Sequence, residues 1–145
     1  MELEGTLKKE GRFWIIEVPP LNLMTQGTTQ KEALEMIVDA AAGLAECYFE
    51  SDLEENAPIT FEAKDYGKGV IGLASTDNKL LLSLSLRRQR EKSGSTVREA
   101  AKRLGSKSPN SYAQYEKGNK RISLEKYAQL LKAANPLTHS LLRVV

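Results

Sequence analysis

The chain contains two kinds of hydrophobic spacing, one typical of strands and one typical of helices. Near the N-terminus, MELEGTLK and RFWIIEV alternate apolar and polar residues around Lys9, Glu10 and Gly11, which predicts a β-hairpin. Pro19 and Pro20 should end its second strand. Apolar residues then recur along TTQKEALEMIVDAAAGLAECYFESDLEE at the spacing of one helix face, so we expect a long helix that packs on the sheet.

The segment after this helix predicts a third strand. ITFEAK alternates apolar and polar residues, whereas the following KDYGKGVI is too rich in glycine to assign. Thr28 or Thr29 can cap the preceding helix, with Glu32 at the third helical position. Cys47, the single cysteine, lies in the apolar pattern of that helix, and we expect it to be a buried small hydrophobe. The N-terminal half therefore predicts an α+β layer with one helix on one face of the sheet.

The C-terminal half predicts four short helices. Its first segment, LLLSLSL, fits both a strand and a helix, and we favour a helix from about Ser83. Thr96 and Glu99 have the spacing of a capping box, and the helix that they begin should end at Gly105.

The last two of these helices have clear boundary residues. Ser108 can cap the third helix, with Pro109 in its first turn and Gly118 after its end. Ser123 can cap a fourth helix that stops before Pro136. In the third helix Tyr112 and Tyr115 should face the interior of the domain, which leaves a polar face rich in amide side chains.

The net charge of +2 conceals a strong asymmetry between the two halves. Residues 1–79 hold 7 Lys/Arg and 15 Asp/Glu, a net charge of −8, whereas residues 80–145 hold 14 Lys/Arg and 4 Asp/Glu, a net charge of +10. A basic module of this kind suits a polyanion such as nucleic acid. The acidic half either meets a basic partner or is a solvated surface.

Four segments of the basic half follow one another in a recognisable order. RRQREKSG, TVREAAKRLG, SPNSYAQYEKGNKRIS and LEKYAQLLKAAN resemble the helix-turn-helix domain of the Xre or lambda-repressor type, over residues 83–135. The resemblance implies that the helix after Ser108 enters the major groove of operator DNA and that the protein binds as a homodimer or homotetramer. The stretch from Gly105 to Tyr112 is one residue longer than is usual in that family, which predicts an extended turn and base contacts displaced by one position.

Side chains on and around this helix suit two kinds of DNA contact. Amide side chains can pair with adenine in the major groove, and the expected base contacts are Asn110, Ser111 and Gln114. Basic and polar residues nearby suit the backbone phosphates, although a solvated surface position explains any single lysine equally well. The expected phosphate contacts are Arg98, Lys102, Lys107, Lys117, Asn119, Lys120 and Arg121.

The acidic half contains the strand RFWIIEV, the following PPL and the segment TQGTTQKEAL. On these segments it resembles the HicB antitoxin family, over residues 1–75. Where that family has Asp-Leu-Pro-Gly after the second strand, this chain has Pro-Leu-Asn-Leu, which predicts a different loop. The resemblance implies a partial ribonuclease-H-like β-β-(β)-α-β fold. It also implies an antitoxin that binds a HicA-like mRNA-cleaving toxin and represses its own operon through the DNA-binding domain.

This interpretation divides the chain into four parts: a toxin-binding domain at 1–75, a linker at 76–82, a DNA-binding domain at 83–135 and a tail at 136–145 that packs or dimerises. His139, the one histidine, should be structural. The densest acidic cluster is the expected toxin contact, although a solvated helix end explains it equally well. Its members are Glu46, Glu50, Asp52, Glu54 and Glu55.

Several function classes are disfavoured by the same sequence. With one His and one Cys, and with its acids mostly on a single helix, the chain offers no triad or two-metal site, so we expect no enzyme, no cofactor and no metal. No apolar run could span a bilayer, and we expect a cytoplasmic protein. Two alternatives stay open: a stand-alone repressor whose N-terminal domain dimerises or senses a ligand, and an interaction module that has lost operator binding.

Overall fold

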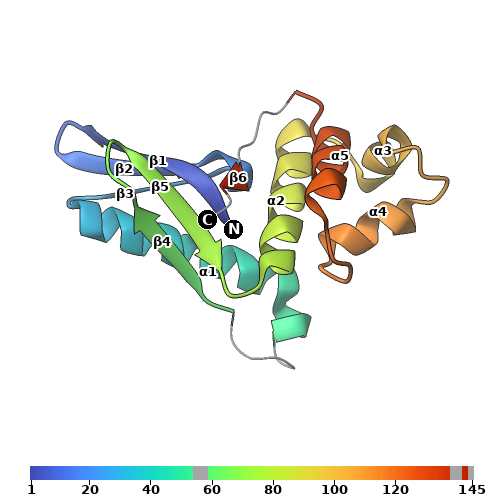
Figure 1. Cartoon of the computed structure of the whole chain (residues 1–145), viewed down its shortest axis with the longest axis horizontal. Helices are drawn as coiled ribbons and strands as arrows, with labels where there is room; N and C mark the ends of the chain where they lie inside the picture. The colour runs from blue at the N-terminus through green and yellow to red at the C-terminus, as the bar shows by residue number, and fades with distance from the viewer. Residues whose placement is uncertain (54–58, 138–141, 144–145) are drawn as a thin grey trace. The chain divides into compact units, whose positions relative to one another are not determined.

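The computed structural model describes residues 1–53, 59–137 and 142–143, and the chain forms two compact units (Figure 1). Unit 1 comprises Met1–Asn78 and the C-terminal strand, and unit 2 comprises Lys79–His139. Unit 1 mixes strands with a helix and unit 2 is helical, as the spacing of apolar residues predicted. The ribonuclease-H-like arrangement stays a prediction.

Unit 1 is built on a sheet whose paired strands are antiparallel throughout. Five strands lie in the order β3-β2-β1-β5-β4, and a sixth short strand pairs with the start of β1. The strands are β1 (Glu2–Glu10), β2 (Phe13–Val18), β3 (Leu23–Gly27), β4 (Phe61–Asp65), β5 (Val70–Ser75) and β6 (Leu142–Arg143).

The predicted hairpin is confirmed as β1 and β2, which pair from Thr6 opposite Glu17 to Glu10 opposite Phe13. A 3-10 turn at Pro19–Leu21 ends β2, as the prolines predicted, and leads into β3. The glycine-rich segment that the sequence left unassigned contains both the turn after β4 and the start of β5. A turn and the start of a strand follow one another within these few residues, so the composition of the segment indicated neither a turn nor a strand.

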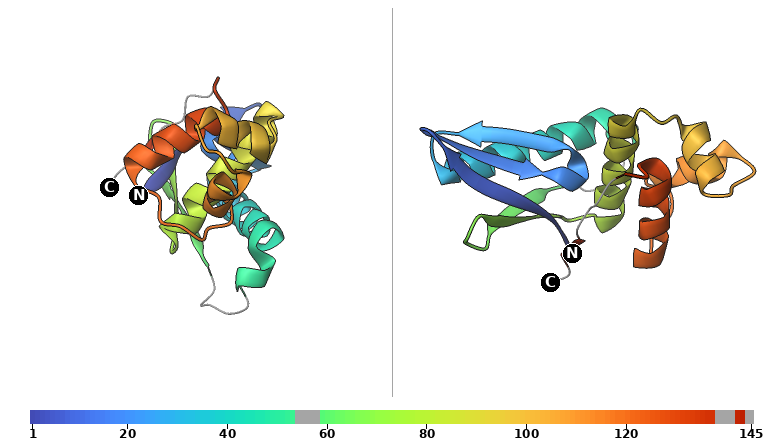
Figure 2. Two further views of the ribbon diagram at one scale, coloured as in Figure 1. Left: turned by 90° about the vertical axis from the view of Figure 1, so that its right-hand side faces the viewer. Right: turned by 90° about the horizontal axis from the view of Figure 1, so that it is seen from above.

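One long helical segment, α1 (Gln30–Leu53), lies along one face of the sheet and has a kink at Phe49, whose φ of −127° and ψ of 24° are not helical (Figure 1 and Figure 2). Both candidate caps take part, because Thr29 Oγ1 accepts a hydrogen bond from Glu32 N at 3.0 Å and Thr28 Oγ1 donates one to the Glu32 carboxylate at 2.9 Å. The helix buries every fourth residue from its second turn onward. These residues are Ala33, Ile37, Ala41, Ala45 and Phe49.

The expectation of a buried Cys47 is wrong, since this thiol is exposed. The residue is two positions beyond Ala45, and two positions along a helix turn a side chain by about 200°, away from the packed stripe. Small residues are frequent on both sides of α1, so the sequence pattern did not separate its two faces.

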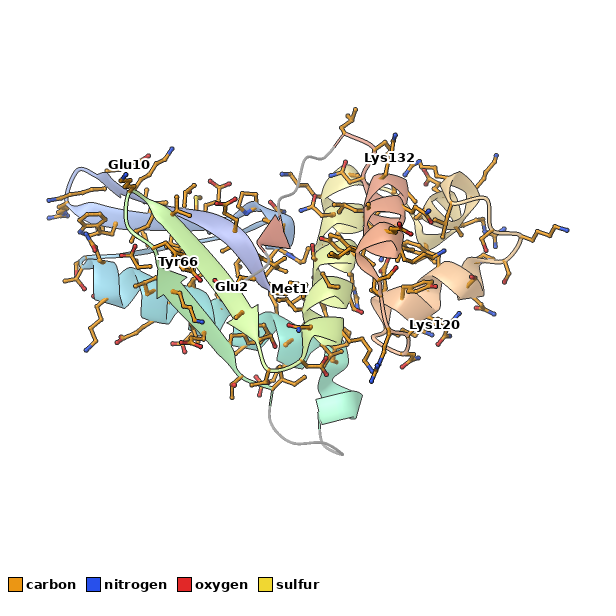
Figure 3. The ribbon with its side chains drawn as sticks, in the orientation of Figure 1. Met1, Glu2, Glu10, Tyr66, Lys120 and Lys132 are labelled. Atoms are coloured by element: carbon orange, nitrogen blue, oxygen red, sulfur yellow. The ribbon has the colours of Figure 1, made fainter. Side chains whose placement is uncertain are left out.

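A buried carboxylate occupies the sheet face that points away from α1. Glu2 is 2% exposed, and the Tyr66 hydroxyl donates to its carboxylate at 2.6 Å (Figure 3). Gly72 provides the space for this group, because a Cβ there would overlap the Glu2 carboxylate. The arrangement joins β1, β5 and the turn after β4.

Unit 2 consists of α2 (Asn78–Ser93), α3 (Val97–Arg103), α4 (Pro109–Glu116) and α5 (Leu124–Ala134). The predicted start at Ser83 and the predicted linker at 76–82 need correction, since α2 already begins at Asn78. Every residue from Leu80 to Leu86 is buried. A helical segment in which every residue is buried has no amphipathic period, and this is why the leucines fitted both a helix and a strand.

Part of the C-terminal tail packs on the sheet of unit 1. Leu142 and Arg143 form β6 and pair with Leu3 and Glu2. Three residues named in the sequence analysis, His139, Glu54 and Glu55, lie outside the described residues. Within the described ranges, no helix is long and apolar enough to cross a membrane.

Gly5 gives a direct test of packing in unit 1. A Cβ at Gly5 would meet the Glu17 carbonyl oxygen and lie 2.9 Å from Ile71 Cδ1, so Gly5→Ala should lower the free energy of unfolding by about 1–3 kcal/mol. Urea unfolding followed by the fluorescence of Trp14, the single tryptophan, reports this unit.

The matched control is Gly43, where an added Cβ has no atom within 4 Å. Gly43→Ala should be neutral or stabilise α1 by up to about 1 kcal/mol. Equal unfolding midpoints for the two variants would contradict the packing described here.

Candidate nucleic-acid interface

The first part of the site is α3 and its capping box. Thr96 Oγ1 accepts a hydrogen bond from Glu99 N at 3.1 Å, and the Glu99 carboxylate accepts one from Thr96 N at 3.3 Å. Gly105 follows the helix with φ +82°, a conformation that favours glycine. Both boundaries agree with the sequence prediction, because each depends on residues a few positions apart.

The second part is α4, which begins at the predicted cap. Ser108 Oγ accepts from Asn110 N at 3.3 Å, and Pro109 occupies the first turn. In the turn before it, Ser106 Oγ donates to the Ser108 carbonyl at 2.9 Å. Gly118, with φ +76°, allows the chain to turn after the helix. The cap at Ser108 and the left-handed Gly118 therefore define where α4 begins and ends.

The predicted base-contact residues share one side of α4. Asn110 and Ser111 are exposed and Gln114 is half-buried, and their spacing of three and four residues places them next to one another. Tyr112 and Glu116 lie on the opposite, buried side. The helix thus presents hydroxyl and amide groups to its surroundings.

The predicted phosphate contacts are all exposed. Arg98 and Lys102 lie one turn apart on α3, Lys107 lies in the turn before α4, and the others follow α4. Lys120, labelled in Figure 3, has its ammonium 5.3 Å from the ring centre of Tyr115. Tyr115 is half-buried rather than fully inward, and its ring face is available to this cation.

The buried side of α4 is attached to α2 by a bidentate ion pair. Arg90 Nε lies 2.7 Å from Glu116 Oε2, and Arg90 Nη2 donates to Glu116 Oε1 at 3.0 Å. A third donor, Nη1, reaches the Ser95 carbonyl at 3.1 Å. The side chains are 15% and 7% exposed, so the pair is largely shielded from water. The hydrogen bonds to Glu116 raise the pKa of Arg90, which stays charged.

A helix-turn-helix family model matches residues 86–142. The matched range contains most of α2 and all of α3, α4 and α5. No curated protein matches the chain. Unit 2 is therefore a helix-turn-helix domain. Its presence supports the interpretation of the protein as a DNA-binding transcription regulator. The prediction that residues 83–135 resemble such a domain is confirmed at this level.

Within the helix-turn-helix domain, α4 follows α3 after a short turn and occupies the position of the recognition helix. The domain spans Lys79–His139 and holds 14 Lys/Arg against 4 Asp/Glu, and one of these four acids is the buried Glu116. Its surface is therefore strongly cationic. A surface of this sign favours the phosphate backbone of DNA whatever the base sequence.

Two further polar contacts fix the helices of the domain to one another. Ser83 Oγ donates to the Tyr115 carbonyl at 2.6 Å, which is a second link between α2 and α4. Asn135 Nδ2 donates to Gln89 Oε1 at 3.2 Å and joins the end of α5 to α2. Side-chain groups on α2 thus contact both α4 and α5.

The two fully packed tyrosines of the domain stay neutral. Burial raises the pKa of Tyr112, and the nearby Glu116 carboxylate raises it further. Burial also raises the pKa of Tyr127, although the hydrogen bond with Ser85, at 2.8 Å, opposes this shift. The described residues contain no group of three or more His, Cys, Asp or Glu side chains that could hold a metal ion.

The ion pair between Arg90 and Glu116 was not predicted. The two residues are 26 positions apart, and each would ordinarily be placed on the surface. One signal in the sequence could have indicated Glu116, since it is four residues after the inward-facing Tyr112 and so shares its side of the helix.

Single replacements of this pair should destabilise the domain strongly. Arg90→Met or Glu116→Leu leaves one buried charge without its partner, and each should lower the free energy of unfolding by about 3–5 kcal/mol. Urea unfolding followed by circular dichroism measures the loss, while Trp14 fluorescence separately reports unit 1.

The double variant R90M/E116L is the control, because it removes both charges at once. We expect it to lose much less than the sum of the two single variants, as buried pairs replaced together by apolar residues usually do. Additive losses would show that the two charges act independently.

Proposed function

We propose that the chain is an operator-binding repressor whose N-terminal unit holds a small basic protein, as in toxin–antitoxin pairs of the HicB type. The arrangement of α4 is the main support for the DNA-binding part of this proposal. Its base-contact candidates, Asn110, Ser111 and Gln114, lie on one side of a helix whose other side is fixed by a buried ion pair. A rigid helix with a polar outer side can read base edges in the major groove.

Repression at an operator requires more DNA contact than one such domain supplies. Proteins with this motif bind two half-sites as dimers, which doubles the number of base and phosphate contacts. We therefore include a homodimer or a higher symmetric assembly in the proposal. Residues 80–145 carry a net charge of +10, so two helix-turn-helix domains repel each other when no DNA is bound. The phosphates of DNA offset this repulsion, and the charge therefore favours assembly on DNA.

The partner-binding part of the proposal is supported by the chemistry of unit 1. Residues 1–79 carry a net charge of −8, and a basic RNA-cleaving protein would be attracted to them through complementary charge. In this proposal the N-terminal unit binds its partner and catalyses no reaction. The likeness to HicB antitoxins is what suggests an mRNA-cleaving toxin as that partner.

A sheet face of unit 1 offers a suitable surface. Alternation along the strands directs Phe13, Ile15 and Glu17 away from α1, and the register places Glu17 opposite Met24. Phe13 and Ile15 are half-buried, Met24 is 65% exposed, and Glu17 is exposed. Lys8 lies opposite Ile15 on the same face. Glu17 and Met24, at the far end of β2, are therefore the part of this face that suits a basic protein surface, and we propose the toxin contact there.

The acidic cluster at the end of α1 is the competing location. Glu46 is exposed on α1 before the kink at Phe49, and Glu50 and Asp52 follow the kink. Variants of Glu17 and Glu46 therefore distinguish the two surfaces.

The DNA-binding part predicts two different effects on affinity. Asn110→Ala should relax base preference, with a loss of about 1–3 kcal/mol on the operator and little change on random DNA. Arg121→Ala should weaken binding to every duplex and lower the slope of log K against log salt by about 0.9. Fluorescence anisotropy with the chain's own promoter at several salt concentrations measures both.

Lys31→Ala serves as the charge control, because it removes one cation from α1 in unit 1. It should leave both the affinity and the salt slope unchanged. An Asn110→Ala variant that weakens operator and random DNA equally would contradict base reading by α4.

The antitoxin part predicts a complex with the product of an adjacent small basic reading frame. Co-expression should give a stable complex, and the partner alone should arrest growth, which co-expression should restore. Glu17→Lys should reduce capture of the partner by at least about tenfold, because it brings a like charge to the contact.

Glu46→Lys is the matched charge reversal on α1 and should leave capture unchanged. Loss with Glu46→Lys alone would move the contact to α1. No complex and no growth arrest, with promoter binding retained, would instead indicate a stand-alone repressor.

A further inference from the structure

Asn119 contacts Gln114 through two separate hydrogen bonds. Its side-chain Nδ2 donates to Gln114 Oε1 at 2.7 Å, and its backbone N–H donates to the Gln114 carbonyl at 3.2 Å. Both groups of Gln114 that accept hydrogen bonds are therefore engaged by one residue outside the helix. Of the three base-contact candidates on α4, Gln114 is the one whose side-chain amide is held in this way among the contacts described here.

The end of α4 explains why Asn119 reaches this position. Gly118 N–H donates to the Tyr115 carbonyl at 3.3 Å, while Asn119 N–H bonds to Gln114 one turn earlier. This pair of bonds is the Schellman motif, which needs a left-handed residue between helix and exit, and Gly118 has φ +76°. The motif returns the chain over the last turn of the helix and brings the Asn119 side chain to Gln114.

The contact changes which hydrogen bonds Gln114 can offer to DNA. A glutamine amide has one acceptor oxygen and one NH2 group with two donors. Pairing with adenine uses both, because N7 accepts and the N6 amino group donates. With Oε1 turned toward Asn119, the NH2 group is the part left to meet a base. Asn119 Nδ2 uses one of the two lone pairs of Oε1 and fixes the direction of this oxygen, so the two donors of the NH2 group point away from the contact. Two donors match guanine, whose N7 and O6 are both acceptors.

We infer that Asn119 is a positioning residue that directs Gln114 to guanine instead of adenine. The inference rests on the proposed DNA-binding function and names a determinant of its base preference. It assigns to Asn119 a role different from the phosphate contact that the sequence suggested. The residue acts through Gln114 and need not touch a base itself.

The experiment is selection of bound sequences from a randomised DNA duplex library by the full-length protein. Gln114→Ala identifies the base position that Gln114 reads, since discrimination should fall at that position. There the unaltered protein should prefer guanine over adenine by about tenfold, the ratio that one good amide-to-base match supplies.

Two variants of Asn119 then separate positioning from a general effect on binding. Asn119→Ala frees the Gln114 amide, so the preference should shift toward adenine. Asn119→Asp replaces the donor by an acceptor, which should attract the Gln114 NH2 group and leave Oε1 facing the base. Its preference should move to bases with an exposed amino group, adenine or cytosine.

Lys120→Ala is the matched control on the neighbouring residue. It should weaken binding to all sequences and leave the preferred base unchanged, as the loss of a phosphate contact does. Circular dichroism of each variant checks that the helix-turn-helix domain is folded.

The failures of the two proposals can be told apart. If the unaltered protein selects no sequence, the proposed operator-binding function fails and this inference with it. If a site is selected, three results overturn the inference alone: no position that depends on Gln114, a preference for adenine in the unaltered protein, or the same preferred base with and without Asn119.

Discussion

The buried ion pair between Arg90 and Glu116 is the constraint on which the helix-turn-helix domain depends. It attaches α4 to α2 through two short hydrogen bonds in a site with little water. Removing one charge from such a site leaves the other buried and unpaired, which costs much more than the net stability that the intact pair supplies, so both charges must be present for α4 to keep this position. This matters for a recognition helix, because base edges are read at hydrogen-bond distances and a small rotation of α4 would displace Asn110, Ser111 and Gln114 together.

The local boundaries of the helices could be read from the sequence with good accuracy. The caps at Thr96, Ser108 and Ser123 depend on residues two or three positions apart, and the structure has each of them. The same holds for the polar side of α4, which follows from its start at Pro109 and the inward position of Tyr112. These features need no knowledge of tertiary structure, because a helix of known start fixes its own faces.

The contacts between distant segments could not be read in this way. Arg90 and Glu116 looked like surface residues, and the leucines of α2 had no clear period because every residue from Leu80 to Leu86 is buried. Cys47 looked buried because small residues occur on both sides of α1. The contact between Asn119 and Gln114 belongs to the same class, since it depends on the turn at Gly118 and not on the helix itself. In each case the missing information was the neighbour, which composition and spacing do not supply.

The short strand β6 returns the chain to the sheet of unit 1. Its two residues pair with the first residues of β1, whereas the helix-turn-helix domain lies in the sequence between β5 and β6. In terms of chain order, the DNA-binding domain is therefore an insertion into unit 1 and not an appendage to it. Its two connections therefore lead to strands of the same sheet, to β5 at one end and to β6 at the other. Loss of the last few residues alone would change that double attachment into a single one.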